Sequence, residues 1–210
     1  MLYALLFSTA ADVIPLEPYV PPATADAAAA LIAGHCGDIY GVQELAFTFV
    51  VVKEGEEVAR RRHVWHPQAG DVTVSWEGFE ATLRSVYPME GAEGVSAEDV
   101  DKAHGAFIND AYWLMAPCKV LDPGVNRSLD DQGRLVLSFE GVGRTPGDVY
   151  RMSYDPNSGE VGRWDFTLQS GREGAFTWEA YQQVGPLRLA TLHKATEGDF
   201  VIRFEDVSVR

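Results

Sequence analysis

Most of this chain of 210 residues alternates apolar and polar side chains with a period of two, in short runs separated by turn residues. Such alternation is typical of strands that bury one face and expose the other. The first run spans 45–52, the turn 54–57 follows it, and a second run returns over 58–66. A third run covers 72–76. The pattern therefore predicts an antiparallel sheet joined by tight turns rather than β-α-β units.

The same alternation resumes after Asp122 and continues to the end of the chain. The predicted strands there lie at 135–139, 149–154, 161–168, around Phe176 and Trp178, at 187–191 and at 200–204. A turn of the expected composition, Asp-Pro-Asn-Ser-Gly at 155–159, separates two of them. We therefore expect a mainly β (α+β) protein whose strands follow one another as a meander.

Two helices interrupt the strands. Thr24 is the predicted N-cap of an alanine-rich helix that ends near Gly34 and Gly37. Ser96 opens a capping-box pattern before a second helix, in which apolar residues recur at helical spacing until Pro117 closes the segment. Several acidic residues fall near the start of this second helix, where the helix dipole favours negative charge.

The amino-terminal 23 residues differ from the rest of the chain. The apolar run 1–7 and the small residues 8–10 are typical of a secretory signal peptide, although no Lys or Arg precedes Lys53. The alternative is a short buried strand. Four prolines between 15 and 22 favour an extended linker. We therefore predict a leader-like segment with a linker at 1–23 and a single domain at 24–210.

Charge and hydropathy limit the classes of partner. The chain carries 17 Lys and Arg against 31 Asp and Glu, a net charge of −14, which disfavours nucleic acid and anionic membrane surfaces as partners. No apolar run reaches the length of a transmembrane segment. The two cysteines, Cys36 and Cys118, leave two interpretations open, a disulfide in an oxidising compartment or two buried thiols.

Motifs for catalysis, metals and cofactors are weak throughout. The glycine-rich stretch 141–147 lacks the helix that a phosphate loop needs, and 155–166 ends in Phe166 where a calcium loop needs Glu. His63 and His66 fall on opposite faces of a strand. We therefore predict a protein that is not an enzyme and that has no metal or cofactor. The alternative is a hydrolase with dispersed carboxylates such as Asp110, Asp122 and Asp148.

Two features allow a binding function. Large aromatic residues alternate along the predicted strands, which indicates either an ordinary core or the lining of an apolar cavity. The second feature is the triplet Arg60-Arg61-Arg62, in which Arg61 faces opposite to its neighbours. The triplet protects an edge strand by its charge, or else one arginine lies beside a cavity and meets a polar or anionic group.

The order of elements, with a helix, long hairpin strands, a helical crossover and further strands, resembles the outer-membrane lipoprotein carriers LolA and LolB. The most similar strings are Phe-Thr-Phe-Val-Val at 47–51, Asp-Val-Tyr at 148–150 leading to Gly-Glu-Val at 159–161, and Asn-Asp-Ala-Tyr-Trp-Leu at 109–114. The last string is also similar to exported bacterial proteins of that fold. No lipobox cysteine follows the leader, so an anchored lipoprotein is not supported.

The resemblance implies a strongly curved antiparallel sheet, or half-open β-barrel, covered by the two helices and enclosing an apolar cavity. It also implies a periplasmic carrier whose ligand is a lipid or lipoprotein acyl chain, with a membrane protein as a further candidate partner. A non-catalytic sensor or protein-interaction domain on the same fold is the alternative. The residues predicted to bind the ligand are Phe47, Phe49, Trp65, Trp76, Trp164, Phe166, Trp178 and Arg61.

Overall fold

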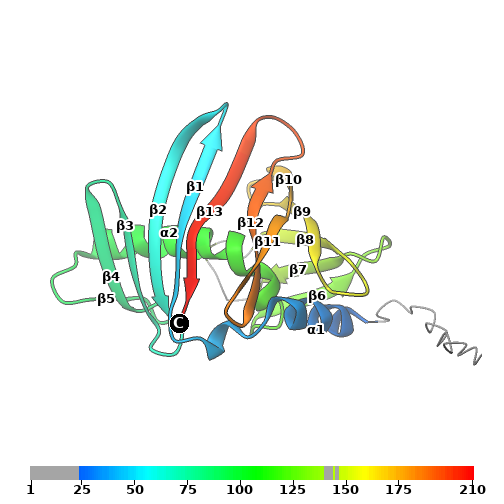
Figure 1. Cartoon of the computed structure of the whole chain (residues 1–210), viewed down its shortest axis with the longest axis horizontal. Coiled ribbons are helices and arrows are strands. Elements are labelled where there is room, and N and C mark those ends of the chain that lie inside the picture. The colour runs from blue at the N-terminus through cyan, green and yellow to red at the C-terminus, as the bar shows by residue number, and fades with distance from the viewer. Residues whose placement is uncertain (1–23, 140–143, 145–146) are drawn as a thin grey trace, which may run out of the picture.

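The strands form two antiparallel sheets, described here from a computed structural model that covers residues 24–139, 144 and 147–210 (Figure 1). The larger sheet has eight strands in the order β11-β12-β13-β1-β2-β3-β4-β5. Their bounds are Glu179–Val184 for β11, Leu187–Lys194 for β12, Phe200–Val209 for β13, Leu45–Lys53 for β1, Glu56–His66 for β2, Asp71–Trp76 for β3, Phe79–Ser85 for β4 and Glu90–Gly91 for β5. The last strand of the chain therefore pairs with the first.

The smaller sheet has five strands in the order β10-β9-β8-β7-β6. Their bounds are Glu173–Thr177 for β10, Val161–Thr167 for β9, Val149–Tyr154 for β8, Leu135–Phe139 for β7 and Val125–Leu129 for β6. An isolated bridge between Phe176 and Ala195 joins β10 to the end of β12, where the two sheets meet. Neither sheet closes on itself, so the predicted half-open antiparallel architecture is confirmed.

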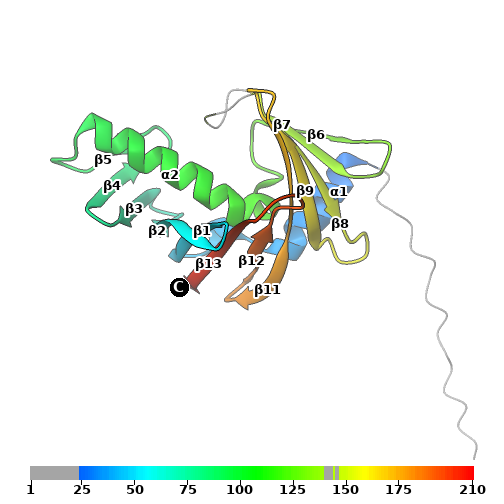
Figure 2. The same ribbon diagram turned by 90° about the horizontal axis from the view of Figure 1, so that it is seen from above.

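Two α-helices cover the sheets. Helix α1 spans Ala25–Cys36, and the Thr24 hydroxyl accepts a hydrogen bond from the Ala27 amide, as expected of its N-cap. Helix α2 spans Ala97–Met115, and the Ser96 hydroxyl accepts from the Asp99 amide. Figure 2 shows α2 crossing one face of the larger sheet and reaching the smaller sheet at its carboxyl end. No helix among the described residues has the length and apolar character needed to cross a lipid bilayer.

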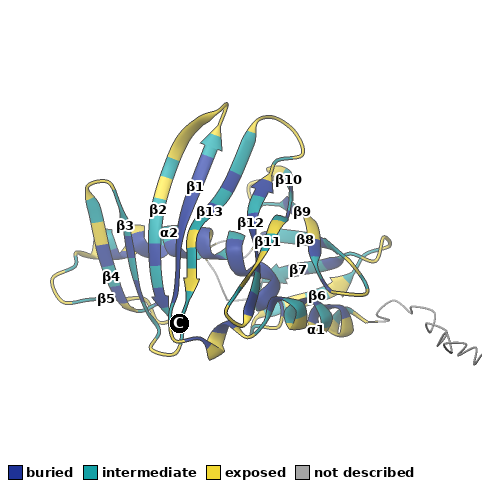
Figure 3. Ribbon diagram, viewed as in Figure 1, coloured by how far each residue is buried: buried dark blue, intermediate teal, exposed yellow. Residues whose placement is uncertain are grey.

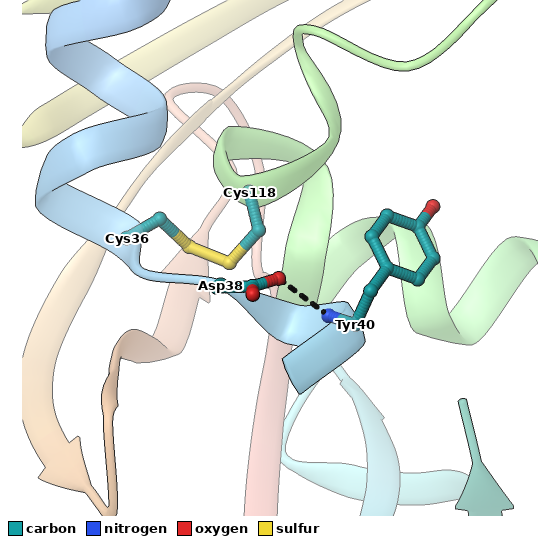
Figure 4. Close-up of a disulfide and its surroundings, with 4 residues drawn as sticks. All are labelled: Cys36, Asp38, Tyr40 and Cys118. Carbon is teal, nitrogen blue, oxygen red and sulfur yellow. Dashed lines mark hydrogen bonds between the residues drawn. A yellow bond between two sulfur atoms is a disulfide. The ribbon is translucent and has the colours of Figure 1, made fainter. Parts of the chain in front are cut away.

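A disulfide joins the two helical segments of the chain. Cys36, at the end of α1, is bonded to Cys118 in the short 3-10 helix η2 (Ala116–Lys119) that follows α2 (Figure 4). The same figure shows the Asp38 carboxylate accepting a hydrogen bond from the Tyr40 amide in a second 3-10 helix, η1 (Ile39–Gly41). The disulfide resolves the choice that the sequence left open between paired and free cysteines.

The core lies between the sheets and the helices, and exposed residues concentrate at the strand turns and sheet edges (Figure 3). Seven consecutive residues of β1, from Leu45 to Val51, are buried, and this strand lies inside its sheet, between β13 and β2. The first helix, the hairpin β1–β2 and the second helix lie where the sequence predicts them. The predicted leader and linker at 1–23 lie outside the described residues.

Three sequence expectations need correction. The Arg60–Arg62 segment is not on an edge strand, because β2 pairs with β1 on one side and β3 on the other. The carboxyl-terminal strands do not continue one meander, because the chain passes from the smaller sheet to the larger one between β10 and β11. Trp178 lies at that junction and not within a strand.

Candidate functional site

An apolar cavity of about 540 Å³ lies between the two sheets and helix α2, and we call it the inter-sheet cavity. This volume is within the range of about 300–1,000 Å³ that is usual for ligand sites. Its aromatic lining comes from both sheets and the helix, and comprises Phe49, Tyr112, Trp113, Phe139, Tyr150, Trp164, Phe166, Phe176 and Phe200. The arrangement provides a largely hydrophobic container with walls of rigid rings.

Regular secondary structure directs these rings inward. Trp164 and Phe166 are two residues apart on β9 and therefore share one face of the sheet. On α2, Tyr112 packs against Tyr150 and Trp164, with ring centroids 5.3 and 5.7 Å apart. Its neighbour Trp113 lies 4.6 Å from the Trp164 ring. Because aromatic rings resist deformation and two of these three pairs are edge to face, the cavity wall is preformed.

A buried ionic cluster fixes α2 to the larger sheet beside the cavity. Arg61 on β2 donates from Nε and Nη2 to the two oxygens of Asp110 on α2, both at 2.6 Å. His63 Nε2 lies 2.8 Å from Asp110 Oδ2, and Asn109 donates to Oδ1. Asp110 and His63 are fully buried. The Arg61 guanidinium also lies 4.9 Å above the Phe49 ring, a cation–π contact at the cavity wall.

Two of the polar residues that line the cavity, Arg144 and Asp148, have partners within the chain. Arg144 donates to Asp101 at 2.9 Å and to His104 Nδ1 at 3.1 Å. Burial and the charge of Arg144 lower the pKa of His104 and so favour the neutral ring that can accept this bond. The buried Asp148 accepts from the Gln169 amide, at 2.9 Å, and from the Tyr150 hydroxyl. Burial, reinforced by Asp148, raises the pKa of Tyr150.

A second cavity, of about 520 Å³, lies on the other side of α2 and is lined by Trp65, Phe107 and Met115 among others. Ile108, Tyr112 and Phe139 line both cavities and therefore form the partition between them. At its rim Tyr40 donates to Asp122 at 2.7 Å, and Lys119 contacts both. Burial first, and then the bond to Asp122, raises the pKa of Tyr40.

The predicted binding residues fall into four groups. Phe49, Arg61, Trp164 and Phe166 line the inter-sheet cavity. Trp65 lines the second cavity instead, and Phe47 and Trp178 are core residues that line neither. Trp76 lines an outer groove and stacks on Phe79 with ring centroids 3.8 Å apart. The role of all eight residues in binding a ligand stays a prediction.

Sequence reasoning missed the helical half of the cavity wall. Tyr112 and Trp113 lie in the Asn-Asp-Ala-Tyr-Trp-Leu string at 109–114, which the sequence singles out only through its resemblance to other proteins. It also missed Asp110 as the partner of Arg61. The signal was a carboxylate on an otherwise apolar helix face, which in a folded chain needs a cation opposite it.

The three carboxylates of the hydrolase alternative do not come together in one catalytic site. Asp110 is bound by Arg61 and His63, Asp122 by Lys119 and Tyr40, and Asp148 by a backbone amide and Tyr150. In the part of the chain that the structure describes, no three His, Cys, Asp or Glu residues are grouped as metal ligands.

Comparison with known proteins identifies the fold. No family model matches the sequence, and neither does any curated protein. A solved LolA-superfamily protein from Nitrosomonas europaea superposes with a TM-score of 0.54 over 90% of this chain and 94% of that one, at 10% sequence identity. The chain has the LolA fold. The resemblance drawn from the order of elements is therefore confirmed at the level of the fold.

Two further solved structures align with the chain at lower scores. A protein of the DUF1329 family from Desulfovibrio piger aligns at a TM-score of 0.44 and 10% identity, over 88% of this chain and 92% of that one. An outer membrane lipoprotein-sorting protein domain from Vibrio parahaemolyticus, described as putative, aligns at 0.43 and 11%, over 87% and 91%.

Proposed function

We propose that this chain is an exported carrier or binding protein that holds an acyl chain, lipid or lipoprotein in the inter-sheet cavity without transforming it. The observation that carries the proposal is the cavity itself, with about 540 Å³ of space and nine aromatic residues in its wall. Burying an acyl chain there is worth roughly 0.8 kcal/mol for each methylene removed from water. The cavity also favours a carrier over an interaction domain, which needs only an exposed surface.

The state of the polar groups supports binding rather than catalysis. Arg61 is held by Asp110 in a bidentate pair, and Asp148 is occupied by the Gln169 amide and Tyr150. A general acid or base needs a reacting atom within hydrogen-bond reach, and these groups are instead directed at each other. They stabilise the walls of the container.

Export is supported by the disulfide between Cys36 and Cys118, because such bonds persist in oxidising compartments such as the periplasm. The LolA fold agrees with this location. The leader at 1–23 and the domain at 24–210 remain part of the same proposal, with a membrane protein as the partner that delivers or accepts the cargo.

The test uses a variant that fills the cavity and a matched variant that does not. Ala59 lines the cavity from β2, whereas its neighbour Val58 is 57% exposed. Protein purified from the periplasm of a Gram-negative host is analysed by native mass spectrometry and by organic extraction. We expect the wild type and Val58→Trp to retain acyl lipid, and Ala59→Trp to lose most of it. All three should keep the same circular dichroism spectrum.

Two results would contradict the proposal. The first is wild-type protein that neither carries lipid from the host nor binds added acyl chains. The second is Ala59→Trp protein that is folded and carries as much lipid as Val58→Trp.

A further inference from the structure

A groove of about 660 Å³ on the outer side of the smaller sheet contains an unusual concentration of arginine for a chain of net charge −14. Arg134, Arg151, Arg163 and Arg172 line it, and the turn between β12 and β13, at 195–197, forms the facing wall. We call it the arginine groove.

Two of these arginines are neutralised by carboxylates. Arg163 and Arg134 bind the two oxygens of Asp165 at 2.5 and 3.1 Å, and Arg134 also binds Asp130 at 2.7 Å. Asp165 is the cross-strand partner of Arg151, yet its carboxylate is already committed to the other two arginines. No ion pair joins Asp165 to Arg151 among the described residues.

The other two arginines keep most of their donors free. Arg151 donates to the Thr167 hydroxyl at 3.3 Å, and Arg172 is exposed. Within the described residues neither guanidinium forms an ion pair. Two exposed carboxylates, Glu173 and Glu197, also line the groove, but in the described part of the chain neither is ion-paired with Arg151 or Arg172. With Asp130 counted, four carboxylates balance the four arginines, and the free guanidinium donors are those of Arg151 and Arg172. Guanidinium groups with free donors are well suited to bind phosphate oxygens.

The arginine groove adjoins the inter-sheet cavity. Phe166, Phe176, Phe200 and Arg172 line both of them. Phe176 lies between the other two rings, with centroids 6.2 Å from Phe166 and 5.8 Å from Phe200. Gly174 lines the groove against the Phe166 ring, where an added Cβ would be only 2.4 Å from the ring carbon Cζ. An apolar space and a cationic one therefore meet at the same three rings.

We propose that the ligand is an amphiphile with a phosphate-containing anionic head group, whose acyl chain occupies the inter-sheet cavity while Arg151 and Arg172 bind the phosphate. This inference rests on the carrier function proposed above and adds the chemistry of the head group. A neutral head group forms no ion pair with these arginines, and a free phosphate lacks the hydrophobic contribution of the chain.

The test compares two amphiphiles that share an acyl chain and a glycerol, 1-myristoyl-lysophosphatidylglycerol and 1-myristoylglycerol, both below their aggregation concentrations. Binding is followed by the change in intrinsic tryptophan fluorescence. We expect the phospholipid to bind about tenfold more tightly to the wild type. In Arg151→Gln/Arg172→Gln that preference should disappear, because affinity for the phospholipid falls by more than affinity for 1-myristoylglycerol.

Arg62→Gln/Arg84→Gln is the matched control. Arg62 donates to the Thr48 hydroxyl at 3.4 Å, much as Arg151 does to Thr167, and Arg84 donates to the Gly91 carbonyl. The control therefore removes two positive charges from the larger sheet that, like Arg151 and Arg172, have no ion-pair partner among the described residues. It should keep the wild-type preference, which separates a local site from a general effect of net charge.

The outcomes distinguish the two proposals. Equal wild-type binding of both amphiphiles would overturn the head-group inference and leave the carrier function standing. Binding of neither amphiphile would overturn both. If glycerol 3-phosphate alone binds as tightly as the lysophospholipid, the groove is a site for free phosphate and the inference fails. Should the double variant not fold, Arg172→Gln alone, at an exposed position, is expected to lose part of the preference, and an unchanged preference would contradict the inference.

Discussion

Arg61 and Asp110 lie 49 positions apart in the sequence and form a bidentate ion pair, with both N–O distances at 2.6 Å, where helix α2 crosses the larger sheet. Asp110 is fully buried, and the Arg61 side chain is 26% exposed. Apolar and aromatic side chains surround this pair on both elements. The pair therefore links α2 to β2 at the wall of the inter-sheet cavity.

Replacing Asp110 by Asn should destabilise the protein strongly. The change leaves the Arg61 charge without a counter-ion and replaces one of the two acceptor oxygens shared by Arg61 and His63 with an NH2 donor. The loss of one partner of a buried pair costs about 3–5 kcal/mol. Urea denaturation gives the free energy of unfolding. Asp101→Asn is the control, because its pair with Arg144 is exposed and is worth about 1 kcal/mol or less.

A double replacement tests whether the pair acts as a unit. Arg61→Met/Asp110→Leu should be less destabilised than Asp110→Leu alone, because no unpaired charge is left in the interior. If Asp110→Asn costs less than about 1 kcal/mol, the pair does not hold the helix in place.

Sequence patterns predicted the contacts between residues close together in the chain and missed those between distant segments. Thr24 and Ser96 cap their helices through bonds to residues only three positions away, so a local pattern is sufficient to find them. The inward direction of Arg61 likewise follows from strand alternation. Its partner Asp110 depends on how α2 lies across the sheet, which no local pattern contains.

The position of β2 inside its sheet was missed for a similar reason. Three consecutive arginines suggest an edge strand, but Arg60 is neutralised on the outer face by Glu57 and by Glu205 of β13. Only the pairing of the last strand with the first brings Glu205 near β1 and β2. The division into two sheets also depends on such distant pairing, since the alternation of β10 and β11 is the same in either arrangement.

Loss of the disulfide should lower stability without changing the fold. Cys36 and Cys118 close a loop across 82 positions, and removal of a native disulfide of this kind costs about 2–5 kcal/mol. We expect Cys36→Ser/Cys118→Ser to unfold at a lower urea concentration than the wild type. A reducing agent should lower the urea concentration at which the wild type unfolds by a similar amount, and it should leave that of the variant unchanged. Rapid labelling of both cysteines by a maleimide in the native, unreduced protein would contradict the prediction.

Gly159, in the turn between β8 and β9, lies against the backbone of helix α1. Its φ of +84° is unfavourable for other residues, and an added Cβ would lie 2.4 Å from the backbone oxygen of Leu31. Gly159→Ala should therefore lower the free energy of unfolding by about 2–4 kcal/mol. Gly171 has a φ of +82° with nothing near its added Cβ, so Gly171→Ala should cost only about 1 kcal/mol. Equal losses in the two variants would show that α1 does not pack on this turn.

His193 should make the protein less stable in acid. Its ring is buried against Trp178, with centroids 4.5 Å apart, and it donates from Nδ1 to the Thr177 carbonyl. Burial lowers its pKa to about 3, against weaker opposing effects of that carbonyl and of Glu179. In the unfolded chain the pKa is about 6.5. Below pH 6.5 the unfolded state therefore takes up a proton that the folded state does not.

The sign follows from this difference in proton binding. The stabilisation that His193 gives as a buried neutral ring is complete above pH 6.5 and is lost as the pH falls toward 3. In the middle of that range the free energy of unfolding falls by about 1.4 kcal/mol for each pH unit. Urea denaturation at pH 7, 6 and 5 should show that the free energy of unfolding falls less on acidification in His193→Asn than in the wild type. His66 is the control, because its bond to Asp71 raises its pKa and so stabilises the folded state at low pH. His66→Asn should therefore not reduce the fall in unfolding free energy on acidification. A fall in unfolding free energy in His193→Asn equal to that of the wild type would mean that His193 is not buried as a neutral ring.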